Sequence, residues 1–198
     1  MNKNKSLILS LALGLSMMAA LPAQAYVVST SGGFTTSTPG AVTFADFDTP
    51  VTVDPAYATI TGGYVNGGAN PGAGGNWLCA TNSSGYCQVV TINFTGMEDY
   101  FGLYWGSNDG AANIVTLFNG ATQVGQITGQ GGPNSFVNIS ATGGSEYFNR
   151  VELTTTGGVG FEVDNLAVRQ QVPVPEPASL ALLGLGLFGL QFSRRRKA

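Results

Sequence analysis

Apolar residues in the long central part of this sequence recur at every second position, and no helical period accompanies them. Residues 90–94 alternate apolar and polar side chains, and residues 101–105 repeat the pattern with three large apolar side chains. In an extended strand this spacing places all the apolar side chains on one face. The central part of the chain is therefore predicted to be all-β.

Turn signals separate the expected strands. The pair Asn119-Gly120 supplies the positive φ angles that a two-residue turn requires, so we expect a hairpin there. Residues 62–77 are rich in Gly and Asn and are expected to form a long surface loop, while residues 26–39 are expected to be loosely ordered. Eight or more short strands argue for a single β-sandwich (jelly-roll-like) domain. The strands are expected at residues 41–46, 57–65, 90–94, 100–105, 112–118, 121–127, 135–140, 147–155 and 160–169.

The N-terminal end has the three parts of a secretory signal peptide. Lys3 and Lys5 precede an apolar run over residues 7–20, and the Ala-Gln-Ala sequence at residues 23–25 is the small-x-small pattern that signal peptidase cleaves. A buried N-terminal helix, the alternative, would not need these parts in this order. We therefore expect residues 1–25 to be removed during export.

The C-terminal end also has three parts. The motif Pro175-Glu176-Pro177 precedes an uncharged apolar stretch at residues 178–192, long enough for about four helical turns, and a basic cluster follows. The stretch is short against the roughly 20 residues that usually span a bilayer. The positive-inside rule nevertheless places the basic cluster in the cytoplasm, so a transmembrane helix is expected. The basic cluster consists of Arg194, Arg195, Arg196 and Lys197.

These parts resemble the PEP-CTERM sorting signal, the Gram-negative counterpart of sortase tails. The resemblance covers residues 173–198 and implies recognition by an exosortase-type membrane processing enzyme near the Pro-Glu-Pro motif. It also implies a precursor anchored in the inner membrane and a mature protein at the cell surface or in the extracellular matrix. Bacteria with such proteins typically make exopolysaccharide, flocs or biofilms. An ordinary C-terminal membrane anchor is the alternative.

The remaining domain, residues 26–172, is strongly acidic. It contains two basic residues, Arg150 and Arg169, and ten acidic residues, since all but Glu176 of the eleven acids lie within it. Its net charge is therefore about −8, which repels nucleic acid and anionic lipid surfaces, so we expect no nucleic-acid partner.

The sequence gives little support for an enzyme. It contains no histidine, which excludes a Ser-His-Asp triad, His-based acid–base chemistry and His-ligated zinc. A carboxylate pair, as in glycoside hydrolases, stays formally open. The spacing of Asp99 and Asp109 does not support such a pair, and the Asn-Asp-Gly sequence around Asp109 is explained as a turn. We expect a protein without enzymatic activity.

Two cysteines, Cys79 and Cys87, flank a short polar loop. In an oxidising, exported setting a close and even pair predicts a disulfide, and two free thiols are the alternative.

A second resemblance concerns the body of the chain. Residues 100–107 and 161–168 look like the bodies of exosortase-dependent surface proteins, and residues 161–168 also resemble the closing strand of galactose-binding-like jelly rolls. Carbohydrate-binding jelly rolls of this kind often hold a structural calcium, so the resemblance implies one near the first and last strands.

Acidic residues occur near both of these strands. Asp46 and Asp48 lie near the first, Glu162 and Asp164 near the last, and the pairing of these strands in a jelly roll would bring carboxylates together. Close carboxylates that stay ionised need a cation, and Ca²⁺ takes hard oxygen ligands. Asp46, Asp48 and Asp164 are therefore candidate calcium ligands. Solvated strand-edge acids, or Asp164 as a turn cap, are the alternative.

Aromatic residues suggest a saccharide-binding surface. Trp77 and Tyr86 lie in or beside the cysteine loop and are the candidates for stacking on sugars, whereas Phe101 and Trp105 are expected in the core. The sequence thus predicts an exported surface or matrix protein that binds or associates with exopolysaccharide. The alternatives are a structural or adhesive coat protein without saccharide specificity and a glycoside-active enzyme.

Overall fold

A computed structural model describes eight stretches of the chain: residues 26–48, 50–66, 75–81, 87–106, 109–129, 134–143, 146–156 and 160–171. The predicted signal peptide, the Pro-Glu-Pro motif, the apolar stretch with its basic cluster and Tyr86 all lie outside these residues. No helix within the described stretches is long and apolar enough to cross a membrane.

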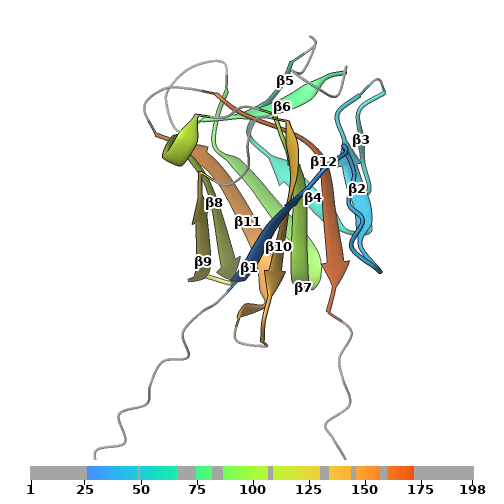
Figure 1. Cartoon of the computed structure of the whole chain (residues 1–198), viewed down its shortest axis with the longest axis vertical. Helices are drawn as coiled ribbons and strands as arrows, with labels where there is room; N and C mark the ends of the chain where they lie inside the picture. Colours follow the sequence, from blue (N-terminus) through green and yellow to red (C-terminus); the bar gives the residue numbers. More distant parts are fainter. Residues whose placement is uncertain are drawn as a thin grey trace, which may run out of the picture.

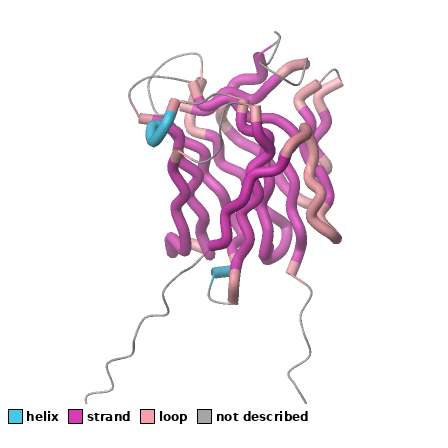
Figure 2. The backbone as a smooth tube through the Cα atoms, in the orientation of Figure 1, coloured by secondary structure: helices cyan, strands magenta, loops and turns pink. Residues whose placement is uncertain are grey.

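Strands account for almost all regular structure in the described chain (Figure 2). The elements are β1 (Tyr26–Ser31), β2 (Val42–Asp46), β3 (Thr52–Val53), β4 (Ala58–Thr61), β5 (Tyr64–Asn66), β6 (Trp77–Ala80), β7 (Val90–Trp105), the 3-10 turn η1 (Gly110–Ala112), β8 (Asn113–Asn119), β9 (Thr122–Thr128), β10 (Ser135–Ala141), β11 (Phe148–Thr155) and β12 (Phe161–Gln170).

The long strand β7 connects two layers. Its first half pairs with β4 and β11, and the β11 side continues through β8 to β9. Its second half pairs with β10 and β12, which continue to β1 and to β2 and β6. Because β7 belongs to both layers, hydrogen bonds join all the described strands into one open sheet, while the layering fits a β-sandwich (Figure 1).

The hydrophobic core lies between these layers. Phe101, Leu103 and Trp105 on β7 are fully or almost fully buried, as their spacing predicted, and the indole of Trp105 packs 4.4 Å from the ring of Phe161. Phe94 lies in the first half of β7, in the other layer, and its ring contacts three more phenylalanine rings, those of Phe44, Phe101 and Phe148. Large aromatic side chains bury much apolar area, which is the main stabilising term for such a core.

A second, smaller cluster lies on the other face of β7. Tyr100 and Tyr104 alternate with the core residues and pack with Phe136 beneath the segment that joins β1 to β2. From that segment, the ring of Phe34 lies 5.2 Å from the ring of Tyr104, and the Thr36 hydroxyl lies 2.7 Å from the Tyr100 hydroxyl. The segment before β2 is therefore fixed to the sheet.

The structure corrects three sequence-based expectations. Residues 26–31, expected to be loosely ordered, form β1 and pair with β10. Residues 62–77, expected to be one surface loop, include β5 and the start of β6. The strand expected at residues 57–65 is broken by Gly62 and Gly63, whose φ angles of 76° and 71° lie in a region that disfavours other residues.

Candidate functional site

Three aspartates meet where β2 ends and β12 passes. The two strands pair antiparallel, with Leu166 opposite Ala45, so the turn after β2 lies beside the first half of β12. One carboxylate oxygen from each of Asp46, Asp48 and Asp164 lies within 4.8 Å of the other two. The structure thus places the three candidate calcium ligands together.

Asp164 is positioned by an irregularity in β12. The register of β12 against β7 shifts between Asp164 and Ala167, and Asn165 between them has a positive φ of 49°, which Asn tolerates better than most residues. Asp164 Oδ1 accepts hydrogen bonds from the backbone N–H of Asn165 at 2.7 Å and of Phe47 at 3.3 Å. These two donors fix the orientation of the carboxylate.

The β2 side of the cluster is a local turn. Asp46 Oδ1 accepts a hydrogen bond from the backbone N–H of Asp48 at 2.9 Å, an arrangement that Asp side chains commonly form at turns. Between the two aspartates, the side chain of Phe47 is buried in the core. The Phe47 anchor and the turn together direct both neighbouring carboxylates to Asp164.

Burial makes this cluster electrostatically unfavourable by itself. Asp164 is 0% exposed, and within the described residues its Oδ2 and the Oδ1 of Asp48 are buried without a hydrogen-bond partner. Burial raises the pKa of Asp164 to about 6, the two backbone donors oppose that rise, and the charges of Asp46 and Asp48 add to it. Two unit charges 4.8 Å apart repel by about 3 kcal/mol at an effective dielectric constant of about 20.

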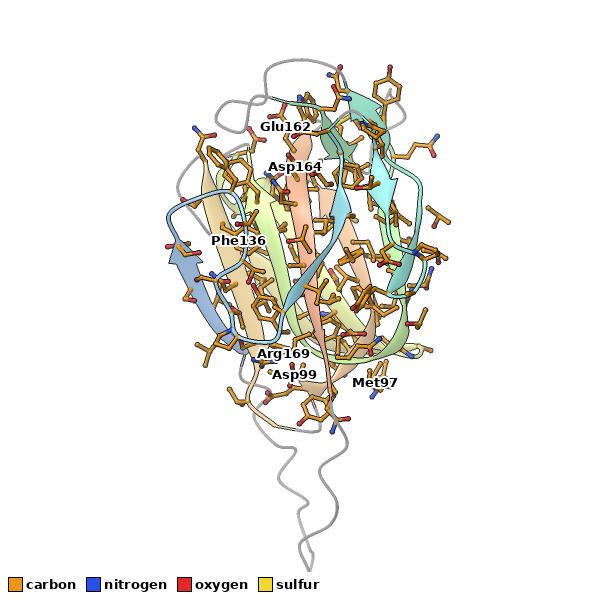
Figure 3. The ribbon with its side chains drawn as sticks, turned by 90° about the vertical axis from the view of Figure 1, so that its right-hand side faces the viewer. Met97, Asp99, Phe136, Glu162, Asp164 and Arg169 are labelled. Atoms are coloured by element: carbon orange, nitrogen blue, oxygen red, sulfur yellow. A yellow bond between two sulfur atoms is a disulfide. The ribbon has the colours of Figure 1, made fainter. Side chains whose placement is uncertain are left out.

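Neither arginine of the described chain relieves this repulsion. Arg169 Nε donates to Asp99 Oδ1 at 2.7 Å, at the opposite end of β12 from Asp164 (Figure 3). Arg150 pairs with Glu152, and its guanidinium lies 3.9 Å from the centre of the Phe118 ring. The negative charge of the cluster therefore has no basic side chain from residues 26–171 beside it.

Glu162 and the two aspartates considered as a catalytic pair, Asp99 and Asp109, do not belong to the three-aspartate cluster. Glu162 lies on β12 two residues before Asp164 but is not part of the three-carboxylate group. Burial raises the pKa of Glu162, and the nearby charge of Asp109 adds to the effect. Asp109 stands immediately before η1, and Asp99 is engaged by Arg169.

Trp77 lies in strand β6 rather than in a loop. β6 pairs on one side with β12 and on the other with β5, and the β5–β6 pair, called the ribbon here, places Tyr64 opposite Cys79 and Asn66 opposite Trp77. Because directly opposed residues and residues two apart share a face, Tyr64 and Trp77 lie on the same face of the ribbon. Tyr64 is 50% exposed and Trp77 is half-buried, so the face presents two aromatic rings. Of these two rings the sequence indicated Trp77 alone, and no local pattern pointed to Tyr64.

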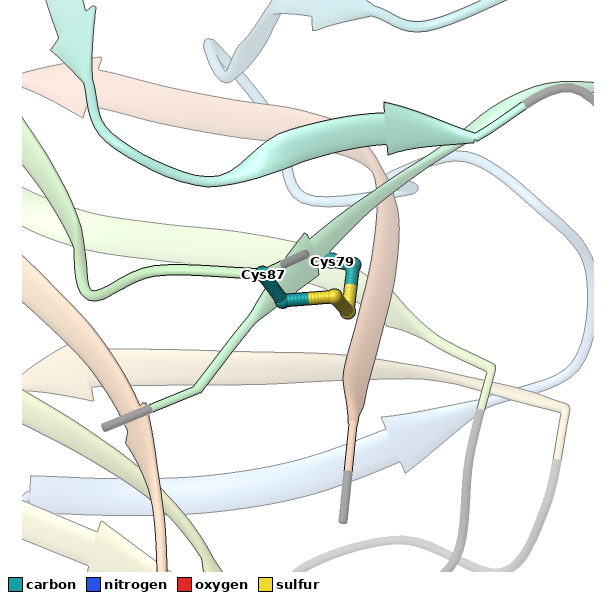
Figure 4. Close-up of a disulfide and its surroundings, with 2 residues drawn as sticks. All are labelled: Cys79 and Cys87. Carbon is teal, nitrogen blue, oxygen red and sulfur yellow. A yellow bond between two sulfur atoms is a disulfide. The ribbon is translucent and has the colours of Figure 1, made fainter. Parts of the chain in front are cut away.

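The predicted disulfide is present beside this ribbon (Figure 4). It joins Cys79 on β6 to Cys87, with Cα atoms 5.4 Å apart. Cys79 is buried and pairs through its backbone with Glu162 on β12, so the bridge fastens the chain after β6 to the sandwich.

A shallow cavity of about 460 Å³ lies over the β2–β3 hairpin. It is lined by residues 43–46 on β2 and by residues 51–55, which include β3. Trp77 and Tyr64 do not line it, so the cavity and the aromatic face are separate features.

Sequence reasoning also missed a buried carboxylate on β7. Glu98 is 0% exposed, and neither of its carboxylate oxygens has a hydrogen-bond partner within the described residues. Burial raises its pKa to about 7, with a further contribution from the charge of Asp99. The Gly-Met-Glu-Asp sequence at residues 96–99 is more typical of a turn than of a strand, so the local sequence does not predict that Glu98 is buried.

The comparison with protein families concerns the C-terminal tail. A family model described as the PEP-CTERM protein-sorting motif matches residues 173–197. The chain carries a PEP-CTERM sorting tail. Such a tail implies processing by exosortase, a membrane enzyme, and therefore an exported, membrane-anchored precursor that is sorted to the cell surface. The match does not extend into the sandwich, and no curated protein and no solved structure matches the chain.

Proposed function

We propose that the β-sandwich is a non-enzymatic surface module that associates with exopolysaccharide once the tail has been sorted. The PEP-CTERM motif at residues 173–197 is the observation that carries this proposal, because it directs the chain to the outside of the cell. Cleavage after Ala25 and anchoring of the precursor through residues 178–192 belong to the same proposal.

The aromatic face supports association with a saccharide. Aromatic rings that stay partly exposed offer flat apolar surfaces, and Trp77 and Tyr64 provide two of them on one face of the β5–β6 ribbon. Tyr86, between Cys79 and Cys87 in sequence, is a further candidate for this surface. The disulfide favours saccharide association because a fixed ribbon loses less conformational freedom on binding.

A structural or adhesive coat protein is the competing function. It shares the export signals and the tail but needs no aromatic contact with sugar. The acidic body, with its net charge of about −8, would also fit a coat in which divalent cations join neighbouring molecules.

Co-sedimentation with the host's own exopolysaccharide separates these functions. The full chain, purified in mild detergent, is mixed with increasing polysaccharide, with and without EDTA. We expect saturable binding that Trp77→Ala weakens at least tenfold. Phe34→Ala is the matched control, because Phe34 is also exposed, at 46%, but packs on Tyr104 instead of the ribbon. Absence of binding by the wild-type chain would favour the coat protein.

A further inference from the structure

We propose that Asp46, Asp48 and Asp164 bind one calcium ion, which fastens the turn after β2 to β12. The donor set contains carboxylate oxygens alone, with no nitrogen or sulfur ligand in the group. Hard oxygen ligands of this kind suit Ca²⁺ and Mg²⁺ and disfavour zinc and copper, which prefer imidazole or thiolate ligands.

The spacing of the oxygens suits calcium. Ca²⁺ lies about 2.3–2.6 Å from its ligands, so two oxygens on opposite sides of the ion can be nearly 5 Å apart. The three oxygens here lie within 4.8 Å of one another, so a single ion can contact one oxygen from each aspartate. Mg²⁺ requires shorter bonds, about 2.0–2.1 Å, and near-ideal octahedral geometry. Three ligands from a turn and a strand irregularity do not impose that geometry.

Buried, unpartnered oxygens distinguish this cluster from a group of solvated acids. Asp164 is fully buried, and its Oδ1 already accepts two backbone hydrogen bonds, while Oδ2 has no partner in the described chain. Asp48 likewise has a buried Oδ1 without a partner there. A buried polar atom normally has a hydrogen bond or a metal ion beside it. One carboxylate oxygen of Asp164 lies within 4.8 Å of an oxygen from each of the other two carboxylates, so a cation at this place would satisfy all three.

Charge balance leads to the same assignment. Three carboxylates together carry three negative charges when ionised, and the two arginines of the sandwich are engaged with Asp99 and Glu152. A divalent cation therefore supplies positive charge that no side chain in residues 26–171 brings to this place.

The site also reaches the start of β6. The backbone of Gly75 lies so close to the Asp48 carboxylate that a Cβ atom at this position would overlap it. Fixing Asp48 therefore fixes the chain two residues before Trp77. A consequence of calcium binding for sugar association through Trp77 rests on the proposed function, whereas calcium binding itself does not.

Direct binding measurements test the site independently of any saccharide. The full chain, purified in mild detergent and stripped with EDTA, is titrated with Ca²⁺ and with Mg²⁺ by calorimetry, and with Tb³⁺ by luminescence. Tyr104 lies directly opposite Asp164 in the β7–β12 pairing, and Trp105 follows it, so these rings should sensitise Tb³⁺ emission. We expect one site per chain, Ca²⁺ bound at least tenfold more tightly than Mg²⁺, and Tb³⁺ emission quenched by Ca²⁺.

Substitutions assign the binding to these residues. Asp164→Asn and Asp48→Asn should each weaken Ca²⁺ binding at least tenfold, since changes even around a metal site cost about 10- to 100-fold in affinity. Asp54→Asn is the matched control, because Asp54 is an exposed acid just after β3 and an asparagine can still accept the Ala56 N–H. Unchanged affinity in the first two variants, equal loss in all three, or no saturable binding by the wild type would overturn the proposal. Equal affinity for Ca²⁺ and Mg²⁺ would overturn the assignment to calcium.

Discussion

Replacing Asp164 with asparagine should stabilise the metal-free protein at alkaline pH. Burial raises the pKa of this carboxyl from an ordinary 3.8 to about 6. This difference of about two units corresponds to about 3 kcal/mol, at about 1.4 kcal/mol per unit. Asparagine keeps an oxygen that can accept the Phe47 and Asn165 N–H groups, and its amide group can donate to Asp46 or Asp48. The substitution thus removes the buried charge and retains the local hydrogen bonds.

The sign of the effect follows from the direction of the pKa shift. Below pH 3.8 the Asp164 carboxyl is protonated in both the folded and unfolded states, so its contribution to stability is fully present. As pH rises through about 6 the folded state must also ionise this buried group, and the contribution is lost. The advantage of Asp164→Asn should therefore be near zero at pH 4 and reach at most about 3 kcal/mol at pH 8.

Urea unfolding followed by tryptophan fluorescence measures this difference. Trp77 and Trp105 are the chain's two tryptophans and both lie in the sandwich, so the signal reports that domain in the full chain. Measurements are made in EDTA at both pH values, with Asp54→Asn as a control expected to change stability by less than about 0.5 kcal/mol. Saturating calcium should reduce the advantage of the variant at pH 8, since ligand at 100 times Kd stabilises the wild type by about 2.7 kcal/mol.

Two results would refute the reasoning. A variant that is less stable than the wild type at pH 8 in EDTA would mean that the Asp164 charge does not destabilise the folded state. An advantage of equal size at pH 4 and pH 8 would mean that the gain does not come from removing an ionisable group.

Other changes test separate parts of the structure by the same unfolding assay. Glu98→Gln should raise the free energy of unfolding by about 1–3 kcal/mol at pH 9 and hardly at pH 4, because burial raises the Glu98 pKa to about 7; no pH dependence of this gain would contradict it. Replacing both Cys79 and Cys87 with alanine should cost about 2–3 kcal/mol, and a reductant should lower the wild type to the same level. Gly102→Ala should cost about 1–3 kcal/mol because a Cβ atom would overlap the Tyr100 hydroxyl, so an unchanged midpoint would disprove this close contact.

The sequence predicts strands best where side chains alternate. Phe101, Leu103 and Trp105 lie in the core because a period of two fixes their common face. The pairing of β2 with β12, which brings Asp46 near Asp164, also follows from the expected sandwich. In both cases local pattern and overall topology agree.

The remaining features depend on contacts between distant residues. Strand β1 has few local signals and is ordered by pairing with β10, more than a hundred residues later. β7 continues through residues 95–99, which lack alternation, because the strand changes partners there and passes from one layer to the other. The burial of Glu98 and of Asp164 is likewise a tertiary effect, and composition favours exposed acids instead.

The role of the sorting tail is tested most directly in the host. Pro175, Glu176 and Pro177 are replaced together by alanine, and the protein is located by membrane fractionation and by protease treatment of intact cells. A strain without exosortase carrying the wild-type chain provides the reference. If the tail directs sorting, the variant should remain in the inner-membrane fraction, as the wild type does in that strain. Delivery of the variant to the cell surface at wild-type levels would contradict the account.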